Sequence, residues 1–223
     1  MWPQADLSDA LVERGFCVVR PEAPWHGRRR KAGYFGGEPV FARGLLGFLE
    51  LFESWVLETA LWIRWARGTI SDRVSLGGVS LGALTCQIVA SVCHHWPEEM
   101  HPDAALLITT TGDLAEGALE GSLLALLDVR NQLEQAEWTM SDMEHWRPLV
   151  EPAERPALEP DRIVMTLGDT DTVLPYDGGS ELARRWKIPS DNLFVSPQGH
   201  FSTALGLYRN SGPIDRAAEV FSA

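Results

Sequence analysis

The chain has 223 residues, of which 45% are hydrophobic and 22% charged, proportions typical of one globular domain with a sizeable core. Its formal net charge of -12 argues against nucleic acid and anionic membranes as partners. No apolar run is long enough to span a bilayer, and the N-terminus lacks the pattern of a signal peptide, so we expect a cytoplasmic protein.

The N-terminal part of the chain predicts a helix, a strand and a long helical region. Residues 7–14 are typical of a short helix that ends at Gly15. Residues 16–20 form an apolar run without alternation, as in a parallel strand covered on both faces. After a loop rich in Pro and Gly, residues 41–67 have a dense apolar face and no proline, which predicts one long helix or two in succession.

Strands and helices alternate along the rest of the chain. Strands are predicted at residues 74–77, 104–109, 162–167 and 192–195, and helices at residues 83–93, 178–186 and 215–221. Strands that alternate with helices pair in parallel, and the helices then cover both faces of the sheet. The sequence therefore predicts an α/β fold of three layers, with a mostly parallel sheet between two layers of helices.

One segment, residues 112–160, interrupts this alternation. Because it is acidic and helix-prone, we expect a helical cap inserted over the strand ends of a single domain that spans residues 1–223. Its large side chains either line an acyl pocket or form the core of helices stacked on the sheet edge. These side chains are Trp138, Met140, Met143 and Trp146.

The three cysteines are predicted to be buried free thiols. Cys17 falls in the strand predicted at residues 16–20, whereas Cys86 and Cys93 fall in the helix predicted at residues 83–93. Their odd number and their apolar surroundings favour a reducing compartment.

A serine lies on a tight turn between the strand at residues 74–77 and the helix that follows it. Gly78 and Gly82 flank Ser80, and side chains at these two positions would collide as the strand and the helix close up. We expect a strained backbone at Ser80 with its hydroxyl exposed. The N-terminus of the following helix favours negative charge, and the N–H of Leu81 is the natural first donor to an oxyanion.

Acidic and histidine side chains follow two further strands. Asp169 and Asp171 come after the strand at residues 162–167, and His200 comes after the strand at residues 192–195. The carboxyl ends of parallel strands share one edge of a sheet, so these side chains and Ser80 are expected to converge.

These motifs, in the chain order Ser, Asp, His, resemble those of the α/β-hydrolases. Residues 168–175 resemble the acid turn of that family, and Gly199-His200 resembles its histidine loop. The loop Pro24-Trp25-His26-Gly27-Arg28 is similar to the one after the family's fourth strand. The resemblance implies an α/β-hydrolase fold and a serine hydrolase that cleaves a carboxylic ester or related acyl bond of a small molecule. We expect no cofactor and no metal, and the oligomeric state stays open.

Each polar residue of these motifs has an expected role. Ser80 attacks the acyl carbonyl, His200 takes its proton and returns it to the leaving group, and Asp171 orients the imidazole. Asp171 matches the family's acid position, while Asp169, which would cap the turn, and Asp113 remain alternatives.

Three residues are expected to bind the oxyanion or the substrate. They are Leu81, Trp25 and His26. His26 either lines the pocket or packs beside Trp25. The family's second oxyanion donor, on a His-Gly-type loop after its third strand, is not visible in the sequence. A catalytically weak or non-catalytic binding protein therefore remains an alternative, as does an acyltransferase with the same triad.

The start of the chain carries a separate expectation. No strand fits in residues 1–6, so the strand at residues 16–20 corresponds to the family's fourth, and a gap would separate it from residues 74–77. We expect that the recorded start is internal to a longer reading frame, with a formed triad but weak activity, or that another chain fills the gap. The rival expectation is direct pairing of residues 16–20 with residues 74–77.

Two clusters of ionisable residues are expected to be structural. His94, His95 and His101 lack the spacing of metal ligands and are predicted to lie at an exposed helix end. The run Arg28-Arg29-Arg30-Lys31 is more typical of a solvated loop than of a site for an anionic substrate.

Overall fold

The computed structural model describes residues 7–114, 121–122, 131 and 139–223. At its centre is a four-stranded parallel sheet with the strand order β1-β2-β3-β4. The strands are β1 (Leu76–Val79), β2 (Ala105–Ile108), β3 (Ile163–Gly168) and β4 (Leu193–Ser196). Each lies within one or two residues of a predicted strand. The parallel arrangement brings the carboxyl ends of all four strands to the same edge of the sheet.

Helices account for most of the remaining described chain. The α-helices are α1 (Ser8–Val12), α2 (Glu38–Ala42), α3 (Gly44–Thr69), α4 (Leu81–Val92), α8 (Met140–Val150), α9 (Tyr176–Arg185), α10 (His200–Gly206) and α11 (Gly212–Ser222). Short 3-10 helices lie at Gly27–Arg29, Cys93–His95, Glu98–Met100, Pro160–Arg162 and Ser190–Asn192. The apolar region predicted as one helix or two overlaps the end of the short α2 and most of the 26-residue α3.

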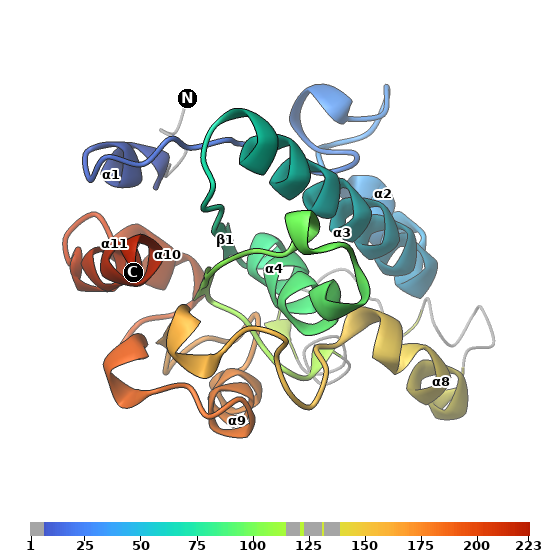
Figure 1. The fold of residues 1–223 in the computed structure, drawn as a ribbon. Coiled ribbons are helices and arrows are strands. Elements are labelled where there is room, and N and C mark those ends of the chain that lie inside the picture. Colours follow the sequence, from blue (N-terminus) through green and yellow to red (C-terminus); the bar gives the residue numbers. More distant parts are fainter. Residues whose placement is uncertain (1–6, 115–120, 123–130, 132–138) are drawn as a thin grey trace.

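Both faces of the sheet are covered by helices, which confirms the three-layer α/β fold class. On one face, Leu107 and Met165 pack with α4 and α9. On the other face, Leu106 and Val164 pack with α11. Neighbouring strand residues point to opposite faces, so the non-alternating apolar runs of β2 and β3 fill both cores. Figure 1 shows α1, α10 and α11 on one side of the strands and α3 and α4 on the other.

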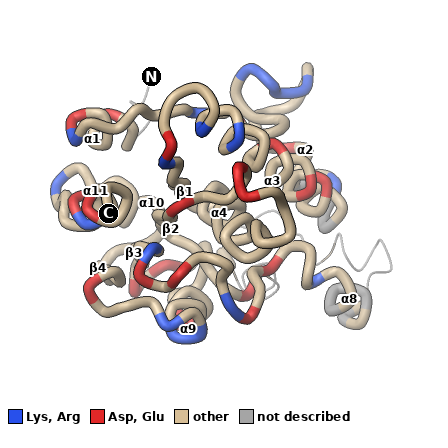
Figure 2. The backbone as a smooth tube through the Cα atoms, in the orientation of Figure 1, with Lys and Arg blue, Asp and Glu red and all other residues tan. Residues whose placement is uncertain are grey.

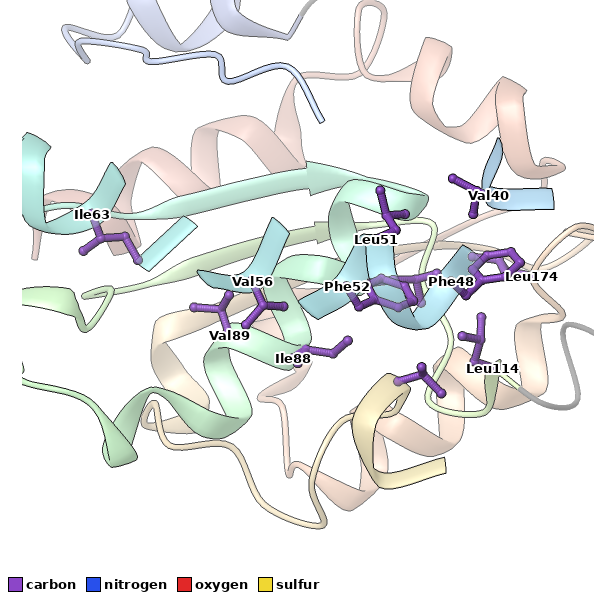
Figure 3. Packing of buried hydrophobic residues seen from close by; sticks show 12 residues of the cluster. Val40, Phe48, Leu51, Phe52, Val56, Ile63, Ile88, Val89, Leu114 and Leu174 are labelled. Carbon is purple, nitrogen blue, oxygen red and sulfur yellow. The ribbon is translucent and has the colours of Figure 1, made fainter. Parts of the chain in front are cut away.

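A third apolar cluster joins α3 to α4. Leu51, Phe52 and Ile63 of α3 are almost fully buried and belong to the same cluster as Ile88 and Val89 of α4. Figure 3 shows this cluster extending from Ile63 at one end to Phe48 and Leu174 at the other. Since Leu174 lies in the loop after β3, α3 supports both the helix after Ser80 and the predicted acid turn.

The prediction of a strand at residues 16–20 is wrong. This segment is extended, but it forms no ladder with any strand of the described chain. Phe16 packs edge-on against Phe221 of α11, with ring centroids 5.9 Å apart. Cys17 is exposed and Val19 is 38% exposed, so the expectation of a buried thiol at Cys17 is also wrong. An apolar run is equally compatible with an extended segment that packs on a helix without joining a sheet.

Strand β1 lies at the edge of the four-stranded sheet. Its ladder partner is β2, with Leu76 opposite Ala105 and Val79 opposite Ile108. Direct pairing of residues 16–20 with residues 74–77 is therefore wrong for this chain.

Only part of the predicted cap falls within the described chain. Helix α8 packs against α3, and Trp146 is 37% exposed. Trp138 lies outside the described residues, and so does most of the segment between Leu114 and Thr139. Among the helices that the structure describes, none is both long and apolar enough to cross a membrane.

Candidate active site

The turn from β1 into α4 places Ser80 at the carboxyl edge of the sheet. The backbone of Ser80 has φ 53° and ψ -117°, a region that costs free energy for a residue with a side chain. A Cβ atom at Gly78 would collide with the Gly82 carbonyl and lie 2.6 Å from the backbone nitrogen of Ala83. The Ser80 N–H also donates to the Ile108 carbonyl at 2.9 Å, so β2 fixes the strand up to the serine. The expected strained turn is therefore present.

Three polar side chains from three strand ends form one hydrogen-bonded chain. The distance from Ser80 Oγ to His200 Nε2 is 2.8 Å, and the distance from His200 Nδ1 to Asp171 Oδ2 is 2.7 Å. The side chains of His200 and Asp171 are each 3% exposed. The structure thus brings together the serine, histidine and aspartate that the sequence motifs single out.

Backbone groups hold the Asp171 carboxylate in place. Its Oδ1 accepts the N–H of Val173 at 2.8 Å and the N–H of Leu174 at 2.9 Å, which leaves Oδ2 for His200. Sequence reasoning missed these two donors, although an Asp that accepts from the backbone two residues ahead is a common turn device. The two bonds orient the carboxylate toward the imidazole.

Close approach of β3 to the loop before α10 fixes the position of His200. A Cβ atom at Gly168, the last residue of β3, would collide with the Gln198 carbonyl and with Thr203 Oγ1. The buried Thr203 lies 3.2 Å from Ser196, measured between hydroxyl oxygens, and its N–H donates to Gly199 at 2.9 Å. Strand β3 therefore packs directly on the loop that leads into α10, of which His200 is the first residue.

The two alternative acids have other surroundings. Asp169 is exposed, and its backbone N–H continues the ladder to Ser196 at 3.0 Å. Asp113 pairs with Arg147 at 2.6 Å. Hydrogen bonding to Glu151 raises the pKa of Arg147, with a further contribution from Asp113.

The predicted oxyanion and substrate-binding residues lie in two places. Leu81 is the first residue of α4, so its N–H is one of the donors that a helix leaves without an internal partner. Trp25 has φ 62° and packs against the same apolar cluster as Leu81. His26 is held within its own loop, with Nδ1 2.8 Å from the Pro24 carbonyl.

A buried polar network ties α4 to the end of β2. Gln87 donates to the Thr111 carbonyl at 2.8 Å and accepts from the Thr110 hydroxyl at 2.7 Å.

A buried thiol, Cys86, lies one residue earlier in α4. Burial raises the pKa of Cys86 to about 12, so this thiol stays protonated at neutral pH. Cys86 is therefore no competitor to Ser80 as a nucleophile.

The inserted segment contacts the loop that carries Asp171. The Ser122 N–H donates to the Thr172 carbonyl at 2.6 Å, and the hydroxyls of the two residues lie 3.1 Å apart. Thr172 directly follows Asp171, so this part of the insertion borders the site.

The predicted histidine cluster and basic run are mostly exposed. The rings of His94 and His95, both exposed, have centroids 3.8 Å apart, and His101 Nε2 lies 2.8 Å from the Trp96 carbonyl. In the part of the chain that the structure describes, no three His, Cys, Asp or Glu residues are grouped to hold a metal ion. The basic run at residues 28–31 is exposed, and Arg29 pairs with Glu58 at 2.5 Å. Figure 2 shows the distribution of basic and acidic residues along the backbone.

The chain is an α/β protein with a parallel sheet. At the carboxyl edge of the sheet, a serine is hydrogen-bonded to a histidine, which is hydrogen-bonded to an aspartate. The sequence motifs that contain these residues resemble those of the α/β-hydrolases. No protein-family model and no curated protein matches the chain.

Several solved structures are similar to the chain. The esterase Pf2001 of Pyrococcus furiosus is 16% identical with a TM-score of 0.46, and the match covers 75% of this chain and 60% of that one. The Zea mays acyl-protein thioesterase 2 is 16% identical with a TM-score of 0.36, and the match covers 73% of this chain and 65% of that one. The esterase Est2 of Thermogutta terrifontis is 14% identical with a TM-score of 0.39, and the match covers 74% of this chain and 61% of that one. The chain thus spans about 60% of the length of the esterase Pf2001.

Proposed function

We propose that this protein is a serine hydrolase that cleaves a carboxylic ester or a related acyl bond of a small molecule. One observation carries the proposal. The Ser80 hydroxyl oxygen lies 2.8 Å from His200 Nε2, and Asp171 Oδ2 lies 2.7 Å from Nδ1 of the same imidazole. A serine hydroxyl is a weak nucleophile unless a base within hydrogen-bond reach removes its proton.

In the first step, Ser80 Oγ attacks the acyl carbon while His200 Nε2 accepts the serine proton. The tautomer that donates from Nδ1 to Asp171 leaves Nε2 free to accept, and the carboxylate stabilises the imidazolium that forms. The N–H of Leu81, at the start of α4, donates to the oxyanion. When the bond to the leaving group breaks, the imidazolium returns the proton to that group.

In the second step, water releases the acyl group. His200 removes a proton from the water, whose oxygen attacks the acyl carbon bound to Ser80. The proton then returns to Ser80 Oγ as the carboxylic acid departs. An acyl acceptor other than water would make the protein an acyltransferase with the same residues.

Turnover of p-nitrophenyl acetate and butyrate tests this function. We expect release of p-nitrophenol by the wild-type chain and a loss of roughly a million-fold in Ser80→Ala. Ser54→Ala is the matched control, because Ser54 is an exposed serine of α3. Equal turnover in Ser80→Ala and Ser54→Ala would contradict the proposal.

A non-catalytic binding protein is the second candidate function. It is favoured by the single oxyanion donor, Leu81, that can be assigned within the described residues. This alternative predicts a folded wild-type chain without turnover of any ester.

The three cysteines are free in the described chain, which supports the further proposal of a reducing, cytoplasmic compartment.

A further inference from the structure

Three exposed apolar side chains follow His200 along α10 and the turn after it. Phe201 is 67% exposed, Leu205 is 53% exposed and Tyr208 is 51% exposed. Their spacing of four and then three residues places them on one side of the helical path. We call these three residues the α10 strip. Exposed apolar side chains that lie on the same side of a helix offer a surface for an apolar ligand.

The opposite side of this segment is firmly anchored. His200 and Thr203 are buried, and Leu207 packs in the cluster that contains Ile108 and Ile214. The exposed side chains therefore stand on a fixed helix, and packing against the sheet does not account for them.

The α10 strip begins at the Ser80–His200 pair. The rings of His200 and Phe201 meet edge to face with centroids 5.2 Å apart, and His200 Nε2 is 2.8 Å from Ser80 Oγ. Val79, the residue before Ser80, is 38% exposed. Exposed apolar side chains thus border the pair on the serine strand and on the histidine helix.

The chemistry determines which part of a substrate lies along this strip. As the bond between Ser80 Oγ and the acyl carbon forms, the bond from that carbon to the leaving group breaks. The leaving oxygen or sulfur then takes the proton that His200 Nε2 received from Ser80, so this atom must lie within hydrogen-bond reach of His200. The leaving group therefore starts beside the imidazole, where Phe201 stands.

We propose that the α10 strip binds an apolar leaving group, so that the preferred substrates are acyl esters of alkyl or aryl alcohols. This inference rests on the proposed function. Phe201 and Leu205 are about 6 Å apart along the helix axis, a distance that several methylene groups span. Covering each further methylene raises kcat/KM by up to roughly fourfold, the effect expected for complete burial.

Butyrate esters of ethanol, butanol, hexanol and octanol, at concentrations below micelle formation, test the proposal. Wild-type kcat/KM should rise with the length of the alcohol. Phe201→Ser/Leu205→Ser should lose roughly tenfold with the octyl ester and less than about twofold with the ethyl ester. Because all four esters form the same butyryl-enzyme, the loss should appear mainly in KM when release of butyrate limits kcat.

Two controls separate this role from a general effect. Phe35→Ser/Leu57→Ser removes two other exposed apolar side chains, 82% and 54% exposed, and should keep the wild-type dependence on alcohol length. Ethyl esters of acids from acetate to octanoate should show the same dependence on acyl length in the wild type and in Phe201→Ser/Leu205→Ser.

Three results would overturn the inference while the proposed function stands. The first is a wild-type kcat/KM that does not change with alcohol length. The second is an equal loss of kcat/KM in Phe201→Ser/Leu205→Ser with every alcohol. The third is a loss in that variant that depends on acyl length instead of alcohol length. Failure of the proposed function has a different signature, which is absence of turnover of every ester by the folded wild type.

Discussion

Strands β1 and β3 both end at residues of the candidate site, yet their surroundings differ. All six residues of β3 are buried, and β2 and β4 pair with it on either side. Strand β1 lies at the edge of the sheet, and Gly77 and Val79 are exposed on the face where α11 covers β2 and β3. Asp171 therefore follows a strand held by two neighbours, whereas Ser80 follows a strand held by one.

This difference indicates how each polar residue is positioned. Burial of β3 and the close approach of Gly168 to the histidine loop fix Asp171 and His200. Ser80 depends instead on its own turn, on one ladder with β2 and on α4. We expect substitutions at β3 to act mainly on stability, and substitutions at the end of β1 to act on activity as well.

Among the variants that compare the two strands, the largest effect is expected at Asp171, three residues after the end of β3. Asp171→Asn should keep the fold and reduce turnover about ten-thousand-fold, because an amide at this position favours the wrong imidazole tautomer. The exposed Asp169→Asn is the control and should change turnover less than about twofold. Turnover of p-nitrophenyl butyrate measures both variants. Full activity in Asp171→Asn would transfer the acid role to another carboxylate.

A pair of truncations compares the two strands in stability. Met165 of β3 is fully buried, so Met165→Ala should lower the free energy of unfolding by about 2–5 kcal/mol. Val79 of β1 is 38% exposed, so Val79→Ala should cost less than about 1 kcal/mol. Urea denaturation followed by circular dichroism measures both values. Similar losses in the two variants would show that the two strands are equally well covered.

A pair of glycines isolates the turn at Ser80. Gly78→Ala places a methyl group 2.6 Å from the Ala83 nitrogen, and we expect a loss of about 1–3 kcal/mol in stability together with lower turnover. In Gly77→Ala the nearest atom, Leu106 Cβ, lies 4.0 Å away, so both quantities should stay close to wild type. The tight turn would lose its assigned role if the two variants behaved alike.

The smallest effect concerns the reactivity of the three cysteine thiols, one of which is exposed and two of which are buried. Cys17 lies in the exposed segment at residues 16–20, whereas Cys86 and Cys93 are buried in and after α4. Burial raises the pKa of Cys86 to about 12 and also raises that of Cys93, so at pH 8 both remain protonated thiols. Ellman's reagent should titrate one thiol in the folded chain and three in urea. Rapid reaction of all three in the folded chain would contradict this arrangement.

Much of the fold follows from local sequence signals. Apolar runs identify β2 and β3, and the glycines beside Ser80 identify the turn, because these patterns describe neighbours close in the chain. The sequence could not show that residues 16–20 stay unpaired in the described chain, because a ladder depends on a second strand at the right distance.

The candidate site was predictable to a similar degree. Position after the strands predicts that Ser80, His200 and an aspartate converge, and the family resemblance selects Asp171, which pairs with His200 in the structure. The N–H donors at Val173 and Leu174 and the helix that begins at His200 were missed, because they depend on the conformation of two loops. The notable exposure of Phe201 likewise follows from how α10 packs on the sheet.

The most direct test of the central claim is covalent labelling with a fluorophosphonate. The account predicts one adduct per chain by intact-mass spectrometry, mapped to the peptide that contains Ser80. The adduct should be absent in Ser80→Ala and retained in Ser54→Ala. A folded wild-type chain that forms no adduct, or forms it at another residue, would contradict the assignment of Ser80 as an activated nucleophile.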